Sequence, residues 1–303
     1  MKKEIRVLCV VPAVVTVLMS LSPSLTFASP KPIDFSLHAS ASGFYSSVQY
    51  KYAAPRFGKL SLVANGKALG MFSVDDGDTV KDVGVHTNFL GTYSPSFRKS
   101  KKAFAVSAGY SAGNARFEAE GIYQKFDVED EKYKTKENAY SFAASLRDET
   151  KAATAVNPQE KHYVSLSNKD VAVAALIANA CYDLIPEDGY VSPSACVGAG
   201  LGFTKFLGIT EQRWIYQAKV GLQYFISGKT VIFASAYVNK LEEKKFEGVR
   251  VKHHISHTTS VSGEQKKEQE PIKITEKIDY LLYPDADMSL FYYGVECGVR
   301  LIL

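Results

Sequence analysis

Apolar and polar side chains alternate with a period of two along much of this chain. Successive side chains of a β-strand point to opposite faces, so this period is typical of a strand with one apolar face and one polar face. Eight segments of about ten residues have this character, although one of them, 171–182, is almost wholly apolar or small. They span residues 44–52, 104–110, 116–124, 171–182, 194–203, 216–224, 231–241 and 293–303.

The connections between these predicted strands differ in length in a regular way. Three of them are long and polar, namely 53–102, 129–169 and 242–288. The others are short, namely 111–115, 183–192, 207–213 and 226–230. An even number of strands that alternate short turns with long loops is typical of an outer-membrane β-barrel, which must close because lipid offers no partner to an open edge. We therefore predict an all-β fold: an eight-stranded antiparallel transmembrane β-barrel with long extracellular loops.

Two other folds fit part of this pattern. Residues 59–74 contain two further apolar stretches, which we interpret as an extension of the first long loop; placed in the sheet, they would give a ten-stranded barrel. A soluble β-sandwich also has short alternating strands, but its outward face carries charge and its connections need not alternate in length. Here the face assigned outward is apolar and aromatic, which favours the barrel. No long apolar run follows Leu21, so no transmembrane helix is predicted.

Aromatic residues are abundant, with 18 Tyr and 17 Phe against a single Trp. Many on the predicted outward face lie near strand ends, where the interfacial girdles of a barrel are found. They are Tyr50, Tyr52, Tyr110, Tyr123, Tyr182, Phe203, Tyr216, Tyr224 and Tyr293. A mean hydropathy of −0.10 is compatible with a membrane barrel, because only every second strand residue has to be apolar.

Residues 1–28 differ from the rest of the chain. Three basic residues precede an apolar run over 7–21, and Ala28 and Ser29 follow it. This order is typical of a secretory signal peptide, and we predict cleavage between Ala28 and Ser29, with 29–303 as a single barrel domain. Cleavage removes three positive charges and one negative charge from a net charge of +4 and leaves about +2. This balance gives no indication of a nucleic-acid partner.

Charged and polar side chains recur on one face of three predicted strands. On the lipid face each charge would be strongly unfavourable near the middle of the bilayer, so we predict that they line the lumen, where opposite charges can pair. They are Arg116, Glu118, Glu120, Gln217, Lys219, Gln223, Glu296 and Arg300. Paired carboxylates can also serve acid–base catalysis, but a network of ion pairs is the simpler interpretation, and we predict no enzymatic activity and no cofactor. Side chains alone can fill an eight-stranded barrel, which argues against a wide pore.

Three cysteines lie beyond the predicted signal peptide. Cys181 and Cys196 are equidistant from the centre of the predicted hairpin turn, so they face each other in a symmetric hairpin. We predict a disulfide in the exported chain, with a pair of small buried thiols as the alternative. Cys297 falls on the lipid-facing side of its predicted strand, as judged from the alternation of side chains, and is predicted to be a free thiol. The histidine cluster at 253–257 lacks a closed set of ligands, so no metal site is predicted.

Several linked motifs resemble those of one known family. They are Gly109-Tyr110-Ser111 with Arg116-Phe117-Glu118-Ala119-Glu120, Asn179-Ala180-Cys181-Tyr182-Asp183 with Cys196-Val197-Gly198-Ala199-Gly200, Tyr216-Gln217-Ala218-Lys219-Val220-Gly221-Leu222, and Gly294-Val295-Glu296-Cys297-Gly298-Val299-Arg300. In this order they resemble the bacterial surface antigen family, of the major surface protein four type, from Anaplasma, Ehrlichia and Wolbachia. The resemblance follows the strands of 43–303 and lapses in the long loops. It implies an outer-membrane barrel on an obligate intracellular bacterium, whose variable loops face the host and its antibodies.

Two hypotheses about function follow. The first is an outer-membrane surface antigen that displays variable loops for host interaction or immune evasion; the second is porin-like passive diffusion of small hydrophilic solutes. The resemblance implies porin activity for some members and adhesion for others. Expected partners are outer-membrane lipid, the outer-membrane assembly machinery, host-cell surface components and antibodies. The chain ends in Leu303 rather than in the aromatic residue that the assembly machinery commonly recognises, so we expect weaker recognition.

Overall fold

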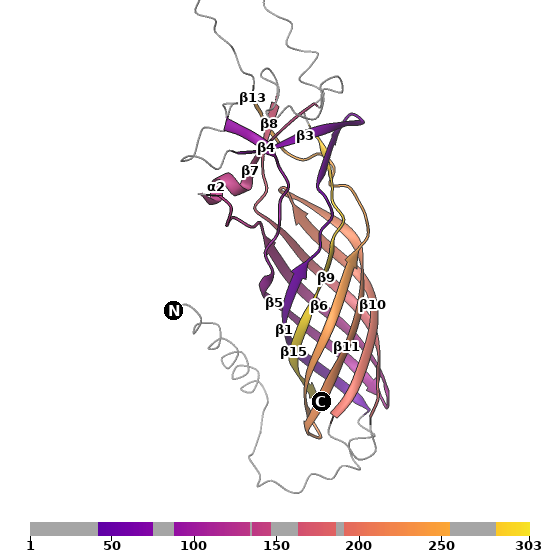
Figure 1. Ribbon diagram of the computed structural model, residues 1–303. Coiled ribbons are helices and arrows are strands. Elements are labelled where there is room, and N and C mark those ends of the chain that lie inside the picture. The colour runs from indigo at the N-terminus through magenta and orange to yellow at the C-terminus, as the bar shows by residue number, and fades with distance from the viewer. Residues whose placement is uncertain (1–41, 75–87, 134, 147–162, 186–190, 255–282) are drawn as a thin grey trace, which may run out of the picture. The chain divides into compact units, whose positions relative to one another are not determined.

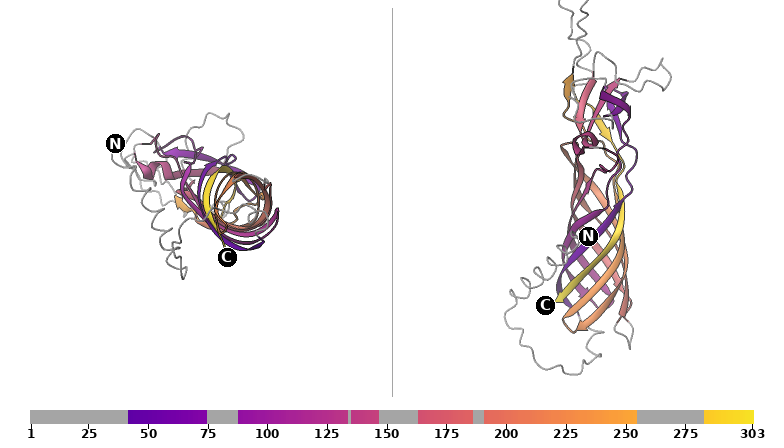
Figure 2. Two further views of the ribbon diagram at one scale, coloured as in Figure 1. Left: turned by 90° about the horizontal axis from the view of Figure 1, so that it is seen from below. Right: turned by 60° about the vertical axis from the view of Figure 1, so that its left-hand side comes forward.

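Eight long strands form a closed antiparallel barrel in the computed structural model (Figure 1). They follow one another around the barrel in chain order, and the last strand pairs with the first. They are β1 Gly43–Pro55, β5 Ser100–Ala112, β6 Ala115–Asp127, β9 Asp170–Asp183, β10 Val191–Phe206, β11 Ile209–Ser227, β12 Thr230–Leu241 and β15 Phe291–Ile302. Seen from below, the strands trace a ring (Figure 2, left). The predicted eight-stranded antiparallel barrel is confirmed.

The structure describes residues 42–74, 88–133, 135–146, 163–185, 191–254 and 283–303. These residues all belong to one compact unit, which runs from Ser36 to Leu303. The predicted signal peptide, with its cleavage site at Ala28 and Ser29, lies outside the described residues, as does His257. No helix in the described ranges is both long and apolar enough to cross a membrane.

Side chains on the barrel strands alternate between the two surfaces of the sheet. On β6, Phe117 is 60% exposed on the outer surface, whereas Arg116 and Glu118 on either side of it are buried inside. The ring is completed where Tyr45 of β1 lies opposite Ile302 of β15. Every barrel strand therefore has a partner on both edges, as a bilayer requires.

The three long connections contribute the strands of a second sheet, which we call the loop sheet. Its strands run in the order β13-β8-β7-β3-β2-β14, and β4 pairs with β3. They are β2 Ser61–Ala64, β3 Lys67–Val74, β4 Phe89–Thr92, β7 Ser141–Leu146, β8 Tyr163–Ser167, β13 Lys252–His254 and β14 Asp285–Asp287. A single turn of helix, α2 Lys136–Tyr140, leads directly into β7. This sheet was not predicted from the sequence.

The segment 59–74 forms a hairpin of the loop sheet. Its turn lies at Asn65 and Gly66, whose φ values of 48° and 77° are those of the type I′ turn that Asn-Gly favours. The hairpin pairs with β14 on one side and with β7 on the other, not with a barrel strand. The interpretation of 59–74 as a loop extension therefore holds, and the ten-stranded alternative is wrong.

One hydrophobic core joins the loop sheet to the interior of the barrel. Near the long connections most inward-facing barrel residues are apolar, and these apolar residues form what we call the apolar layer. Its members are Ile122, Phe126, Val171, Val173, Phe206, Ile215 and Leu241, all of them buried. They belong to the same buried cluster as Leu62 of β2 and Phe142 of β7. This half of the barrel interior is therefore filled by side chains.

Candidate functional site

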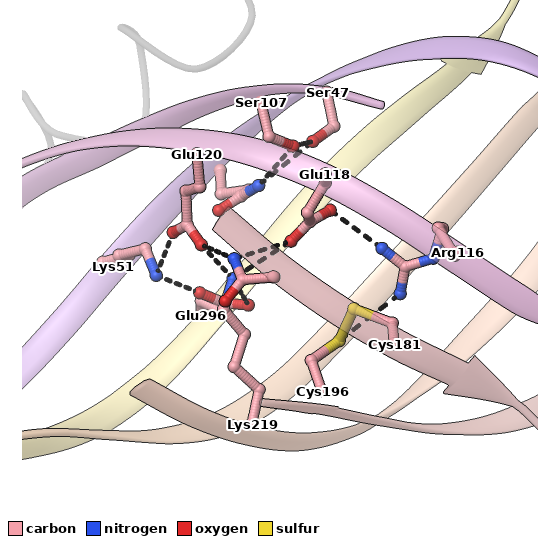
Figure 3. Close-up of polar contacts among 12 residues, drawn as sticks. Ser47, Lys51, Ser107, Arg116, Glu118, Glu120, Cys181, Cys196, Lys219 and Glu296 are labelled. Atoms are coloured by element: carbon pink, nitrogen blue, oxygen red, sulfur yellow. Dashed lines mark hydrogen bonds and ion pairs between the residues drawn. A yellow bond between two sulfur atoms is a disulfide. The ribbon is translucent and has the colours of Figure 1, made fainter. Parts of the chain in front are cut away.

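The middle of the barrel interior contains a cluster of four charged side chains from four different strands (Figure 3). Lys51 of β1 contacts Glu120 of β6, with Nζ 2.7 Å from Oε1, and it also contacts Glu296 of β15. Lys219 of β11 contacts Glu120 and lies 3.3 Å from Oε1 of Glu296. These four side chains are at most 5% exposed.

The contacts of this cluster cross the lumen. Strands β6 and β11 are separated by β9 and β10 in the sheet, so Lys219 and Glu120 do not lie on neighbouring strands. Lys51 and Glu120 are likewise separated, by strand β5. Their direct contact shows that the side chains meet across the interior and leave little space between them at this level.

A second group of polar contacts lies closer to the short turns. The guanidinium of Arg116 donates two hydrogen bonds to Asp183, of 3.1 and 3.3 Å, and a third of 2.8 Å to Glu118. Glu118 also accepts a hydrogen bond of 3.0 Å from the hydroxyl of Tyr45. Asn179 joins the two groups, because its Nδ2 donates to Glu118 at 3.2 Å and to Glu120 at 3.0 Å. We call both groups together the lumen network.

The disulfide of the barrel lies beside this network. Cys181 of β9 is paired opposite Cys196 of β10, and their sulfur atoms are bonded. Nη2 of Arg116 lies 3.6 Å from Sγ of Cys196. A carboxylate oxygen of Glu118 also lies within 4.8 Å of both sulfur atoms. Sulfur atoms that are bonded to each other are not thiolates, so this group does not offer the ligands that a metal such as zinc requires.

The other predicted lumen residues are also buried, but they stand apart from the central cluster. Arg300 donates a hydrogen bond of 2.8 Å to Gln223, and its guanidinium lies over the rings of Tyr45 and Phe233. Gln217 is 4% exposed, and its amide has no hydrogen-bond partner within the described part of the chain. All eight residues predicted from strand parity thus lie inside the barrel, and five of them belong to the lumen network.

The remaining predicted residues lie outside the barrel interior. Cys297 is exposed on the outer surface of β15. His253 is exposed on β13, and His254 belongs to the same strand of the loop sheet.

Four members of the lumen network were missed at the sequence level, namely Tyr45, Lys51, Asn179 and Asp183. Lys51 shares a face with Ser47 and Gln49, so the parity argument applied to the other strands would have found it. Asn179 lies in a segment that is otherwise apolar or small, and Asp183 falls where a turn was predicted. The signal for these two was weak, because neither is flanked by charges of the same parity.

The sequence is similar to those of known proteins. The sequence model of a family described as surface antigen matches residues 37–303. The chain is 26% identical over 226 residues to major surface antigen 4 of Anaplasma marginale. The aligned residues make up 74% of this chain and 76% of the relative.

Two solved structures, one of a Neisserial surface protein and one of an outer membrane protein, are similar to this chain. Neisserial surface protein A matches with a TM-score of 0.37 and 11% identity, over 86% of this chain and 97% of that one. The outer membrane protein OprG of Pseudomonas aeruginosa matches with a TM-score of 0.38 and 8% identity, over 88% of this chain and 99% of that one. Since the family model covers the barrel and its connections, this chain belongs to the surface antigen family and is a surface-exposed protein of the outer membrane.

Proposed function

We propose that this protein presents a folded binding surface, built from its three long connections, to host components outside the cell. The loop sheet carries this proposal: strands from three separate connections pair with one another and share one hydrophobic core with the barrel. In outer-membrane barrels the long loops are extracellular and the short turns are periplasmic. The loop sheet is therefore the part of the molecule that host molecules and antibodies can reach.

A folded surface suits recognition better than flexible loops do. Fewer residues lose conformational freedom when a partner binds, so less of the binding free energy is lost to ordering. The loop sheet also leaves polar side chains exposed, such as Lys67 beside the hairpin turn and Lys252 on β13. We infer that such exposed positions, rather than the buried core, determine which partner is bound.

Passive diffusion of solutes is the alternative function, and the filled interior argues against it. The side chains of Lys51 and Glu120 are 0% exposed in the middle of the lumen, and the apolar layer lies on its extracellular side. Each carboxylate of the lumen network is engaged with a cation, an amide or a hydroxyl. Such carboxylates are not placed to act on a substrate, so the proposed function involves neither catalysis nor a cofactor.

We further propose the steps by which the protein reaches the cell surface. Residues 1–28 would be removed during export by cleavage between Ala28 and Ser29, and the assembly machinery would then insert the barrel. Sequencing the N-terminus of protein recovered from outer membranes should give Ser29 as the first residue. A first residue far from Ser29 would contradict this step.

Binding of bacteria to host cells tests the proposed function. Bacteria that display the full chain should bind host cells, and a Phe142→Asp variant should lose most of this binding. This substitution places a carboxylate in the fully buried core of the loop sheet and lies outside the barrel strands. In both proteins the barrel is checked by its different mobility in SDS before and after boiling. If the full chain confers no binding, or if the variant binds equally well, the loop sheet is not the binding surface.

A further inference from the structure

Four basic side chains stand on the outer surface of the barrel, at the strand ends nearest the long connections. Arg56 follows β1, Lys101 lies near the start of β5, and Lys205 and Lys240 lie near the ends of β10 and β12. All four are exposed. Within the described ranges none of them has a carboxylate at ion-pair distance. We call these four residues the basic rim.

Two members of the basic rim contact outward-facing tyrosines. The guanidinium carbon of Arg56 lies 6.0 Å from the centre of the Tyr293 ring. The hydroxyl of Tyr50 donates a hydrogen bond of 2.7 Å to the backbone carbonyl of Lys101. Both tyrosines are exposed on the outer surface of the barrel. Tyrosine is typical of the interface between hydrocarbon and headgroups, so these cations lie at headgroup level.

Of the other two members, Lys240 stands beside aromatic residues on its neighbouring strands, and Lys205 follows an aromatic residue on its own strand. Lys240 lies opposite Phe291 on one neighbouring strand and opposite Tyr216 on the other. The backbone nitrogen of Arg56 donates to the carbonyl of Phe291. Cations and aromatic rings therefore alternate in one row across β1, β15, β12 and β11. Lys205, on the neighbouring β10, lies two residues beyond the exposed Phe203.

At the opposite ends of the same strands the described residues include one comparable cation, the exposed Lys229 in the turn before β12. The outward positions there are apolar or uncharged in every described barrel strand. They include Phe44, Ala112, Ala115, Tyr182, Val191, Ile226, Thr230 and Leu301. Among the described residues, basic side chains are thus concentrated at the interface near the long connections, with the four cations of the basic rim there against one at the other interface.

We propose that the basic rim binds the phosphate groups of anionic lipids in the outer leaflet of the membrane. Lysine and arginine bind phosphate through charge-assisted hydrogen bonds, and basic residues at an anionic membrane surface strengthen binding. The unpaired cations supply the charge, and the adjoining aromatic rings place it at the depth of lipid headgroups. An acidic polysaccharide outside the cell has the same charge as the lipid, but it would not need cations at the level of the aromatic girdle.

The chain offers both a probe and a matched control for this proposal. Trp214 is the only tryptophan of the sequence, and it is 50% exposed on β11, between the strands that carry Lys205 and Lys240. Lys125 is a further outward cation near the same interface, but its Nζ lies 3.1 Å from Asp127 and 3.0 Å from Asp170. Its charge is already balanced by these carboxylates, so it should contribute little to lipid binding.

The experiment measures quenching of Trp214 fluorescence by brominated lipids. The full chain is inserted into vesicles of phosphatidylcholine with a minor fraction of phosphatidylglycerol, and either one or the other lipid is brominated. We expect brominated phosphatidylglycerol to quench the fluorescence of Trp214 more than its mole fraction predicts. This excess quenching should decrease at high salt, because salt screens the attraction between the cations and the lipid. Each cation near an anionic surface increases the affinity for that surface about fivefold. The preference for phosphatidylglycerol should therefore be lost when all four rim residues are replaced by glutamine.

The variants separate the possible outcomes. Lys125→Gln should keep the lipid preference of the unmodified chain, and all variants should keep the mobility difference in SDS that marks a folded barrel. Equal quenching by the two brominated lipids in the unmodified chain would overturn the proposal. Loss of the preference in Lys125→Gln, or its retention in the fourfold variant, would do so too. If the fourfold variant instead lost only the binding of an acidic polysaccharide such as heparin, the rim would be a polysaccharide site and not a lipid site.

Discussion

Buried charges of both signs lie close together inside the barrel. The five buried cations among the described residues are Lys51, Arg116, Arg213, Lys219 and Arg300, and the four buried carboxylates are Glu118, Glu120, Asp183 and Glu296. A buried charge loses its hydration, and only close partners of opposite sign compensate for that loss. The energetic importance of each residue therefore depends on the partners that would remain if it were removed.

Replacing Lys219 by methionine should destabilise the barrel strongly. Lys219 contacts three carboxylates, from Glu118, Glu120 and Glu296, and its loss would leave them with too few cationic partners in the lumen network. Breaking a buried ion pair from one side costs about 3–5 kcal/mol. The measurement is the free energy of unfolding in denaturant, followed through the fluorescence of Trp214.

The double variant Lys219→Met with Glu120→Gln is the control for this prediction. It leaves one cation and one carboxylate, Lys51 and Glu296, in the central cluster, so it should recover part of the lost stability although it removes one more ionic group. A single variant as stable as the unmodified protein, or a double variant that is destabilised by the sum of both single changes, would contradict the idea that charge balance matters.

The disulfide should stabilise the barrel through the hairpin that it closes. Cys181 and Cys196 are 15 residues apart in the chain, and closing a loop of this length stabilises a fold by about 3 kcal/mol. Replacing both cysteines by serine should lower the denaturant midpoint, whereas Cys297→Ser, on the outer surface, should leave it unchanged. Equal midpoints for all three proteins would show that the crosslink does not limit unfolding.

At the scale of elements, sequence parity predicted the barrel well and the loop sheet not at all. A barrel strand must alternate along its whole length, so positions such as Arg116 and Glu296 could be assigned to the interior from spacing alone. The strands of the loop sheet are short, and β2, β7 and β13 come from three different connections. Their pairing depends on contacts between distant segments, which no local pattern records. Lys51 was missed because only the outward-facing residues of its strand were interpreted, and its inward-facing residues were not assigned to the lumen.

The loop sheet should lose its order before the barrel does when its core is weakened. Phe142 is fully buried, and its ring stacks on Tyr93 at a centroid distance of 4.2 Å. Truncating a buried phenylalanine to alanine costs about 3–5 kcal/mol. In Phe142→Ala we expect a protease to cut the long connections sooner, while the barrel strands stay protected. Phe117→Ala, on the exposed outer surface, is the control and should leave the cleavage rate unchanged.

At the scale of the whole molecule, two successive layers close the lumen. The lumen network brings side chains from non-neighbouring strands into contact, and the apolar layer packs against residues of the loop sheet on the extracellular side. The layers depend on different forces, since one is held by ion pairs and the other by burial of apolar surface. Weakening one of them should therefore leave the other in place.

Reconstituted in a planar bilayer, the full chain should insert without carrying a sustained ionic current. An eight-stranded barrel is just wide enough to be filled by side chains, and here Lys51 and Glu120 in the middle of the lumen are completely buried. Insertion is verified independently by protease protection of the barrel strands, and a general porin in the same bilayer shows that currents can be detected. Lys219→Met should also remain closed, because the apolar layer does not depend on that charge. Stable current steps from the unmodified chain would show that ions pass through the lumen. The protein would then have a porin-like function, and surface display could no longer be its whole function.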